Sequence, residues 1–141
     1  MKKPLLTLLI LLTTLSWCIA QHHDSPSPTS SKVVSTSLLE QLVNDKGIQD
    51  RLVKMETVEF PPLYSGKPHR HPCPLFAYVL EGELESVFEG QSFHYKMGDS
   101  FYEKANGLHE SMKNLSKTQS AKLLIFYISE KGATTYVPEK N

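Results

Sequence analysis

Residues 66–83 read Gly-Lys-Pro-His-Arg-His-Pro-Cys-Pro-Leu-Phe-Ala-Tyr-Val-Leu-Glu-Gly-Glu and contain the most informative spacing in the chain. In an extended strand, side chains two residues apart point to the same face, so the imidazoles of His69 and His71 can reach one metal ion. Two histidines on a surface loop would give the same pattern, and the pair alone is weak evidence. The apolar run from Phe76 to Leu80 predicts a strand that ends in a turn at Gly82.

A second stretch, residues 98–109, reads Gly-Asp-Ser-Phe-Tyr-Glu-Lys-Ala-Asn-Gly-Leu-His and ends in a third histidine, His109. Neutral imidazoles are ligands for Zn, Fe, Ni, Cu or Mn. Three of them leave coordination positions open for water or a substrate. A site of this composition is therefore able to support chemistry.

The first stretch resembles the first motif of the cupin superfamily, in which HxH precedes a strand that ends in a glycine turn. The second stretch resembles the second cupin motif, with His109 at the position of its metal ligand. The resemblance implies a single antiparallel β-barrel of the cupin type, similar to a jelly roll. It also implies one divalent metal ion (Fe, Mn, Ni, Cu or Zn) held by His69, His71 and His109.

The chain departs from the cupin pattern at several positions. Leu75 stands where the motif has a metal-binding glutamate, Lys104 and Asn106 replace a proline and a glycine, and Lys113 replaces an asparagine. The chain is similar in this respect to small cupins with an aliphatic residue at the glutamate position and a glutamate shortly before the last histidine. That similarity implies a role for Glu103 as a fourth ligand or a general base. The alternative is a strand-end glutamate that faces solvent.

The chain from residue 51 onward has the pattern of short strands separated by turn residues. We expect strands at Arg51 to Phe60, Phe76 to Leu80, Glu83 to Phe88, Ser92 to Lys96, Ser100 to Glu103, His109 to Leu115, and Lys122 to Ser129. Residues 33–47 are ambiguous, because a capping box suits a short helix while a strand from Val33 to Leu39 also fits. The sequence predicts one all-β domain over residues 33–141.

Residues 1–20 have the pattern of a cleavable signal peptide, with Lys2 and Lys3, an apolar run and a small-residue end at Ala20. Cleavage near Ala20-Gln21 would place the protein in the periplasm or outside the cell. Residues 21–32 are rich in Ser, Pro and His, without a periodic apolar pattern, and are expected to be a flexible linker. No membrane span is expected after cleavage.

The charge balance excludes one class of partner, since 15 basic residues match 15 acidic ones. Nothing in this composition favours binding to nucleic acid or to an anionic membrane. Once the leader is removed, Cys73 is the sole cysteine and no internal disulfide can form. Cys73 is predicted to be a loop residue that is reactive, dimer-forming or, less favourably, a fourth metal ligand.

Several other residues are given structural roles. Phe76, Tyr78 and Phe88 are expected to pack inside the barrel, because strands prefer aromatic residues in any case. His94 stands alone on a hairpin strand and is expected at the surface. Asn114-Leu115-Ser116 fits a glycosylation sequon, which has meaning only in a eukaryote.

Two functions remain open from the sequence. The first is a metal-dependent oxygenase or isomerase that acts on a small organic molecule in the barrel. The second is a non-catalytic module that binds a metal or a small ligand, for example as a sensor. A barrel without metal is disfavoured, because three histidines fall on all three motif positions. A homodimer is expected, since exposed edge strands invite pairing.

Overall fold

The computed structural model describes residues 32–140, which contain strands and no helix. The strands are β1 (Val34–Asp45), β2 (Ile48–Phe60), β3 (His69–Arg70), β4 (Leu75–Glu81), β5 (Glu83–Phe88), β6 (Gln91–Lys96), β7 (Ser100–Glu103), β8 (Leu108–Lys113), β9 (Ala121–Glu130) and β10 (Val137–Pro138). The predicted leader and nearly all of the predicted linker, residues 21–32, lie outside the described residues. Between residues 32 and 140 there is no helix with the length and apolar character needed to cross a membrane.

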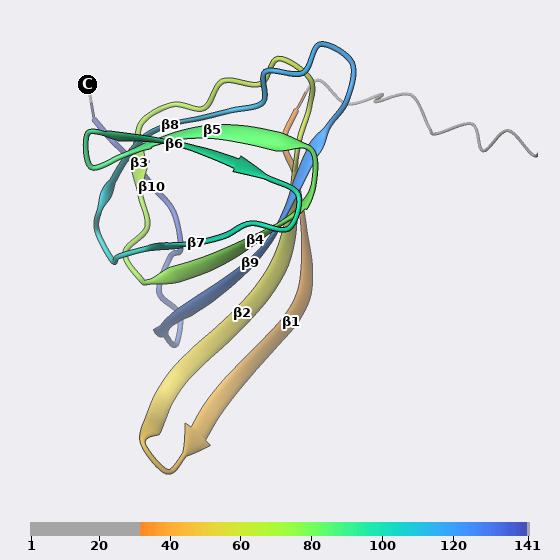
Figure 1. Ribbon diagram of the computed structural model, residues 1–141. Coiled ribbons are helices and arrows are strands. Elements are labelled where there is room, and N and C mark those ends of the chain that lie inside the picture. Colours follow the sequence, from red (N-terminus) through yellow and green to blue (C-terminus); the bar gives the residue numbers. More distant parts are fainter. Residues whose placement is uncertain (1–31, 141) are drawn as a thin grey trace, which may run out of the picture.

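The strands form two five-stranded sheets with antiparallel pairing throughout. The first sheet has the order β1-β2-β9-β4-β7, and the second has the order β10-β3-β8-β5-β6. Figure 1 shows the two sheets facing each other, with the β1–β2 hairpin extending beyond the body of the barrel. The predicted all-β antiparallel barrel is confirmed.

The seven predicted strands all exist, and two of them have the predicted bounds. The predicted turn between β5 and β6 is a two-residue hairpin loop, in which Glu89 and Gly90 have φ values of 52° and 73°. Two consecutive positive φ values are what a type I′ turn requires, and this turn matches the twist of the flanking strands. The local signals therefore located the strands well.

The ambiguous segment before residue 48 is the strand β1, and the helix alternative is wrong. β1 pairs with β2 along its length, from Val34 opposite Glu59 to Asp45 opposite Ile48. Gly47, with φ of 92°, makes the turn between the two strands. A capping box is a local preference, and here the long pairing with β2 overrides it.

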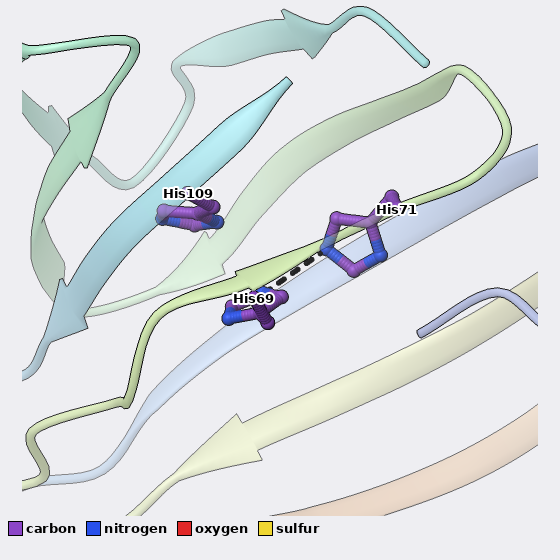
Figure 2. Close-up of side chains that lie close together, drawn as sticks. All are labelled: His69, His71 and His109. Carbon is purple, nitrogen blue, oxygen red and sulfur yellow. Dashed lines mark hydrogen bonds between the residues drawn. The ribbon is translucent and has the colours of Figure 1, made fainter. Parts of the chain in front are cut away.

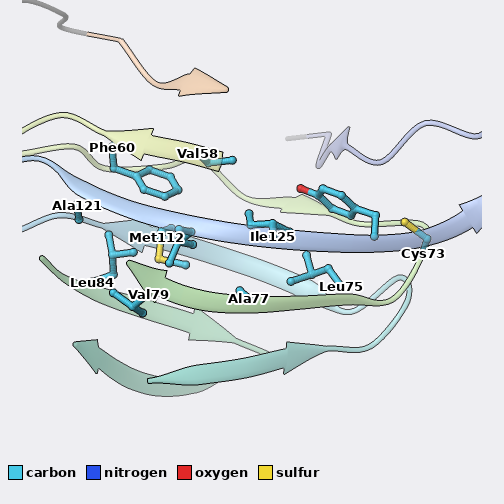
Figure 3. Close-up of a cluster of buried hydrophobic side chains, with 12 residues drawn as sticks. Val58, Phe60, Cys73, Leu75, Ala77, Val79, Leu84, Met112, Ala121 and Ile125 are labelled. Carbon is cyan, nitrogen blue, oxygen red and sulfur yellow. The ribbon is translucent and has the colours of Figure 1, made fainter. Parts of the chain in front are cut away.

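The core lies between the two sheets and follows the alternation of the strands. On β4, Leu75, Ala77 and Val79 point inward and are buried. Among residues 32–140, twelve side chains form the core: Val58, Phe60, Cys73, Leu75, Ala77, Val79, Leu84, Met112, Ala121, Leu123, Ile125 and Tyr127. Figure 3 draws this cluster. The same alternation sends Phe76 and Tyr78 outward, where they are 46% and 44% exposed. The prediction that these two pack inside the barrel is wrong, because Leu75, Ala77 and Val79 occupy the inward face of β4.

Cys73 also differs from the prediction of a reactive loop cysteine. It is only 5% exposed and belongs to the hydrophobic core. Burial raises the pKa of its thiol, which favours the unreactive protonated form. Cys73 is therefore a packing residue, and a dimer-forming disulfide would require the core to open.

Asn114 lies just after β8 and is buried, which differs from the exposed position that a glycosylated sequon requires. Its side-chain amide donates to the carbonyl oxygens of Phe60, Pro61 and Gln119 at 3.1, 3.1 and 2.9 Å. Its Oδ1 accepts from the backbone N–H of Ser116 at 3.0 Å. With 1% of its surface exposed, this amide is not accessible to a glycosylating enzyme in the folded protein.

Candidate metal centre

The two short motifs converge because β3 pairs directly with β8. His69 and His109 are register partners across these strands, and His71 follows His69 by two residues on the same side. One nitrogen from each of the three rings lies within 4.8 Å of the others. Figure 2 shows the three imidazoles grouped together from strand β8 and the β3 segment. The structure thus brings together the three residues predicted as ligands.

Hydrogen bonds fix which nitrogen of His69 and His71 faces the cluster. The Nδ1–H of His69 donates to the carbonyl of Lys67 at 2.9 Å, and the Nδ1–H of His71 donates to the carbonyl of Thr135 at 2.6 Å. A carbonyl can only accept, so Nδ1 carries the proton in both neutral rings. The two Nε2 atoms are then lone-pair acceptors, and they lie 3.2 Å apart. Two facing lone pairs repel unless a cation lies between them, so this arrangement fits a metal ion.

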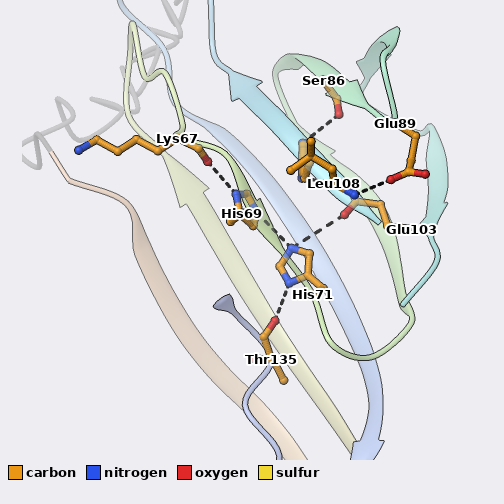
Figure 4. A network of polar contacts seen from close by, with 9 residues as sticks. Lys67, His69, His71, Ser86, Glu89, Glu103, Leu108 and Thr135 are labelled. Atoms are coloured by element: carbon orange, nitrogen blue, oxygen red, sulfur yellow. Dashed lines mark hydrogen bonds and ion pairs between the residues drawn. The ribbon is translucent and has the colours of Figure 1, made fainter. Parts of the chain in front are cut away.

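His109 and Glu103 complete the cluster from the opposite side. The hydroxyl of Ser86 lies 3.0 Å from Nε2 of His109, while Nδ1 of His109 lies 3.2 Å from Oε1 of Glu103. Oε2 of Glu103 lies 3.9 Å from Nε2 of His71. The contact between Nδ1 of His109 and Glu103 is short but is not a hydrogen bond, so Nδ1 of His109 is buried without a hydrogen-bond partner, as is Oε2 of Glu103. Figure 4 shows this network of polar contacts. Buried polar atoms without partners are costly, and a bound ion would supply the missing interaction.

Glu103 lies across the sheet from Leu75, the residue that stands at the position of the motif glutamate. Leu75 on β4 and Glu103 on β7 are register partners, and both are buried, with 2% and 3% exposed surface. Side chains of register partners lie on the same face of a sheet, so Glu103 enters the barrel beside Leu75. The alternative of a solvent-facing Glu103 is wrong.

Burial also sets the protonation of the histidines. Desolvation lowers the pKa of His69 to about 4 and outweighs the raising effect of the Lys67 carbonyl, while His109 and His71 each lower it by a smaller amount. Desolvation lowers the pKa of His71 as well. Both imidazoles are therefore neutral at pH 7, which is the form that binds a metal.

The three histidines line a cavity of about 210 Å³ inside the barrel. The rest of its wall is mostly apolar and includes Val58, Phe60, Leu75, Phe101, Met112, Leu123 and Ile125. The described residues that line it include neither lysine nor arginine. The cavity therefore combines the imidazoles of the cluster with a mostly hydrophobic wall.

Sequence reasoning missed a second carboxylate on this wall, Glu56 of β2. Its Oε2 lies 2.6 Å from Nζ of Lys54, and its side chain is 9% exposed. Burial, followed by the neighbouring Glu56, raises the pKa of Tyr127, whose hydroxyl stays protonated. The alternation along β2 places Lys54 and Glu56 on the inward face, but no motif marks them.

Two other contributions to the site had no sequence signal. Thr135 acts through its backbone carbonyl, which any residue possesses, and Ser86 lies on a strand outside both motifs. His94, in contrast, is exposed as predicted, and its Nε2 lies 3.2 Å from Oε2 of Glu83. Cys73 is not part of the histidine cluster.

Comparisons with known proteins agree with this fold. No curated protein matches the chain. Among solved structures, a cupin superfamily protein from Desulfitobacterium hafniense is 18% identical, with a TM-score of 0.56 over 71% of this chain and 80% of that one. KdgF from Halomonas sp. is 22% identical, with a TM-score of 0.55 over 81% of this chain and 94% of that one.

The DMSP lyase DddQ from Ruegeria pomeroyi is also similar, at 18% identity and a TM-score of 0.59, over 82% of this chain and 59% of that one. Likeness at these identities concerns the fold. A family model described as the Cupin domain matches residues 56–127, a range that contains the end of β2, all of β3 to β8, most of β9 and all three histidines. From its sequence motifs, its two antiparallel sheets and this match, the chain belongs to the cupin family.

Proposed function

We propose that this cupin binds one divalent transition metal ion through His69, His71 and His109, and acts on a small organic molecule in the adjoining cavity. The observation that carries the proposal is the pair of Nε2 atoms 3.2 Å apart, each with its Nδ1 turned to a carbonyl. Fe, Mn, Ni, Cu and Zn all suit an imidazole site. When bound, the ion would supply Lewis acidity and open coordination positions.

The residues of the chain have separate parts in this function. Glu103 has one carboxylate oxygen without a hydrogen-bond partner, so it is available either as a fourth ligand or to accept a proton from a bound molecule. Its burial excludes bulk water from that oxygen. The apolar part of the cavity wall binds the remainder of the molecule and limits its size.

The cavity also restricts the class of substrate. A volume of about 210 Å³ admits only a small molecule, and the mostly apolar lining favours an uncharged body. Two carboxylates, Glu56 and Glu103, line the same cavity, and no lysine or arginine of the described chain does so. A substrate with an oxygen donor at one end and an apolar remainder fits these walls. An anionic group far from the metal does not.

The alternative is a non-catalytic module that binds the metal or a small ligand. It is favoured by Leu75, which leaves no carboxylate at the motif position itself. An oxygen-uptake or turnover assay that compares the native protein with Glu103→Gln separates the two functions. If Glu103→Gln keeps the metal but loses turnover, Glu103 is a catalytic group and the protein is an enzyme.

Export to the periplasm or to the outside of the cell is part of the proposal and rests on the signal-peptide pattern of residues 1–20. Amino-terminal sequencing of the mature protein should begin near Gln21. A mature protein that still begins at Met1 would overturn this part.

The metal content of the purified protein tests the proposal. We expect about one ion per chain in the native protein and less than about a tenth in His69→Ala/His109→Ala, because a site with one remaining histidine lacks the ligands for tight binding. His94→Ala is the matched control, since His94 is exposed and paired with Glu83. Elemental analysis is the measurement. A native protein that holds no metal after reconstitution with each of the five ions contradicts the proposal.

We further propose that the chain forms a homodimer. The twelve-residue strand β1 is an edge of the first sheet. On the outer face of this sheet, successive register partners form an apolar row across all five strands: Leu39, Met55, Phe126, Phe76 and Tyr102. Burying this row and pairing this edge would both stabilise a dimer.

Light scattering after size exclusion measures the mass of the species in solution. We expect twice the chain mass for the native protein and a shift toward the monomer for Phe76→Lys/Tyr102→Lys. A native monomer at micromolar concentration overturns the dimer.

A further inference from the structure

The segment after β9 runs from the first sheet to the second and becomes its edge strand. β10 pairs with β3, with Val137 opposite Arg70 and Pro138 opposite His69. Figure 1 shows β10 beside β3, at the edge of the second sheet. The last described residues therefore lie directly against the HxH strand. We call residues 133–140 the C-terminal strap.

The strap contacts two of the three candidate ligands. The carbonyl of Thr135 accepts the Nδ1–H of His71 at 2.6 Å, as Figure 4 shows. The ring of Tyr136 stacks on His69, with centroids 4.6 Å apart and planes 27° apart. The same ring lies edge-on to His71, with centroids at 6.2 Å. Both residues also line the cavity.

Arg70, the residue between the two histidines, fastens the strap. Its Nε donates to Oε2 of Glu139 at 2.7 Å, and its Nη1 donates to the carbonyl of Asn106 at 2.7 Å. The backbone N–H of Glu139 donates to the carbonyl of Pro68 at 3.0 Å. Arg70 points away from the histidines by strand alternation, so it can join the strap to the loop that precedes His109 without entering the site.

The contact to Thr135 has a chemical consequence for His71. A neutral imidazole carries its proton on either nitrogen, and the hydrogen bond made by one nitrogen decides which is free to bind a metal. The described chain offers the Nδ1 of His71 this carbonyl as its hydrogen-bond acceptor. Without the strap, Nδ1 would face water, which stabilises both tautomers.

We propose that the C-terminal strap is the positioning segment of the metal site. The Thr135 carbonyl selects the His71 tautomer whose Nε2 faces the cluster, and the Tyr136 ring covers His69 and slows exchange of the ion with solvent. The first part concerns the metal-free protein, while the second part rests on the proposed function. Tyr136 is a positioning residue here, because it acts on the ligands and not on a substrate.

The test uses full-length Tyr136→Ala/Glu139→Lys, which removes the stacked ring and reverses the charge that faces Arg70. Phe93→Ala/Glu130→Lys is the matched control, since Phe93 is a stacked ring like Tyr136, and both of its residues are exposed and lie outside the site. Tyr136→Phe keeps the ring and should behave as the native protein. Circular dichroism establishes that each variant is folded, and the single change Glu139→Lys serves if the double variant is not.

The first measurement is long-range proton–nitrogen NMR of the histidine rings in metal-free protein. We expect a single tautomer for His71 in the native protein and in the control, with the proton on Nδ1, and a mixture of tautomers in Tyr136→Ala/Glu139→Lys. If His71 in that variant still has a single tautomer with the proton on Nδ1, the positioning role is wrong. This result does not depend on whether the protein binds metal.

The second measurement is the release of cobalt to an excess of chelator. Changes in groups that orient metal ligands cost about 10- to 100-fold in metal affinity, and we expect release from the double variant to be at least about tenfold faster than from the control. Equal rates overturn the covering role of Tyr136. If the native protein takes up no cobalt or other ion, the proposed function and the covering role both fail, and the NMR measurement alone decides the rest.

Discussion

Saturation with the metal that the protein prefers is expected to raise its melting temperature by about 10 °C. A ligand that binds only the folded state at 100 times its dissociation constant stabilises that state by about 2.7 kcal/mol. For a domain of this size, 1 kcal/mol corresponds to about 4 °C. The gain arises because the facing Nε2 atoms of His69 and His71, and the unpaired Oε2 of Glu103, have no cation to neutralise them without metal.

His69→Ala/His109→Ala should show no metal-dependent shift. In the absence of metal, the same variant should melt within a few degrees of the native protein. The substitutions lose packing contacts of the two imidazoles, but they also remove the repulsion between the facing lone pairs of His69 and His71, and the two effects partly cancel. Differential scanning calorimetry with and without chelator measures both quantities. An equal shift in the native protein and the variant would mean that the metal stabilises the fold from another place.

Replacing Gly82 by alanine is expected to destabilise the fold by about 3 kcal/mol. Gly82 has a φ of +75°, and a left-handed conformation costs an L-residue roughly 1–2 kcal/mol. An added Cβ would lie 2.9 Å from both the Cα and the Cβ of Ala121, which is fully buried. Because backbone cannot move aside as a side chain can, overpacking adds about 1–3 kcal/mol.

Gly90→Ala separates these two causes. Gly90 has nearly the same φ, +73°, but no atom lies within 4 Å of the Cβ that alanine would bring. Gly90→Ala should therefore lower the free energy of unfolding only by the conformational cost, about 1 kcal/mol. Urea unfolding measures the free energies of both variants. If the two losses are equal, the close approach to Ala121 contributes nothing and the packing argument is wrong.

The features that sequence predicts well in this protein are those set by neighbours along the chain. Short apolar runs identify β4 and β9, and turn glycines identify where the strands end, because both depend on a few consecutive residues. The HxH spacing places His69 and His71 on one face for the same reason. His109 joined them only through the resemblance to a motif.

Tertiary structure alone decided the rest. Whether residues 34–45 form a helix or a strand depends on β2, and whether Cys73 is reactive depends on the core that closes over it. Which face of β4 is buried depends on which side of its sheet faces the second sheet, and the residues of β4 alone do not show this. The predicted burial of Phe76 and Tyr78 is wrong for this reason.

The sequence by itself determined an all-β barrel and the three histidines that form its candidate metal site. What only the tertiary structure decided is how these histidines are held: Glu103 beside Leu75 across two strands, and the Thr135 carbonyl on His71 from 64 residues away. The physical reason is that strand alternation and turn conformation are properties of a short segment. Cross-strand register and the docking of a backbone carbonyl leave no local pattern in the residues that make them.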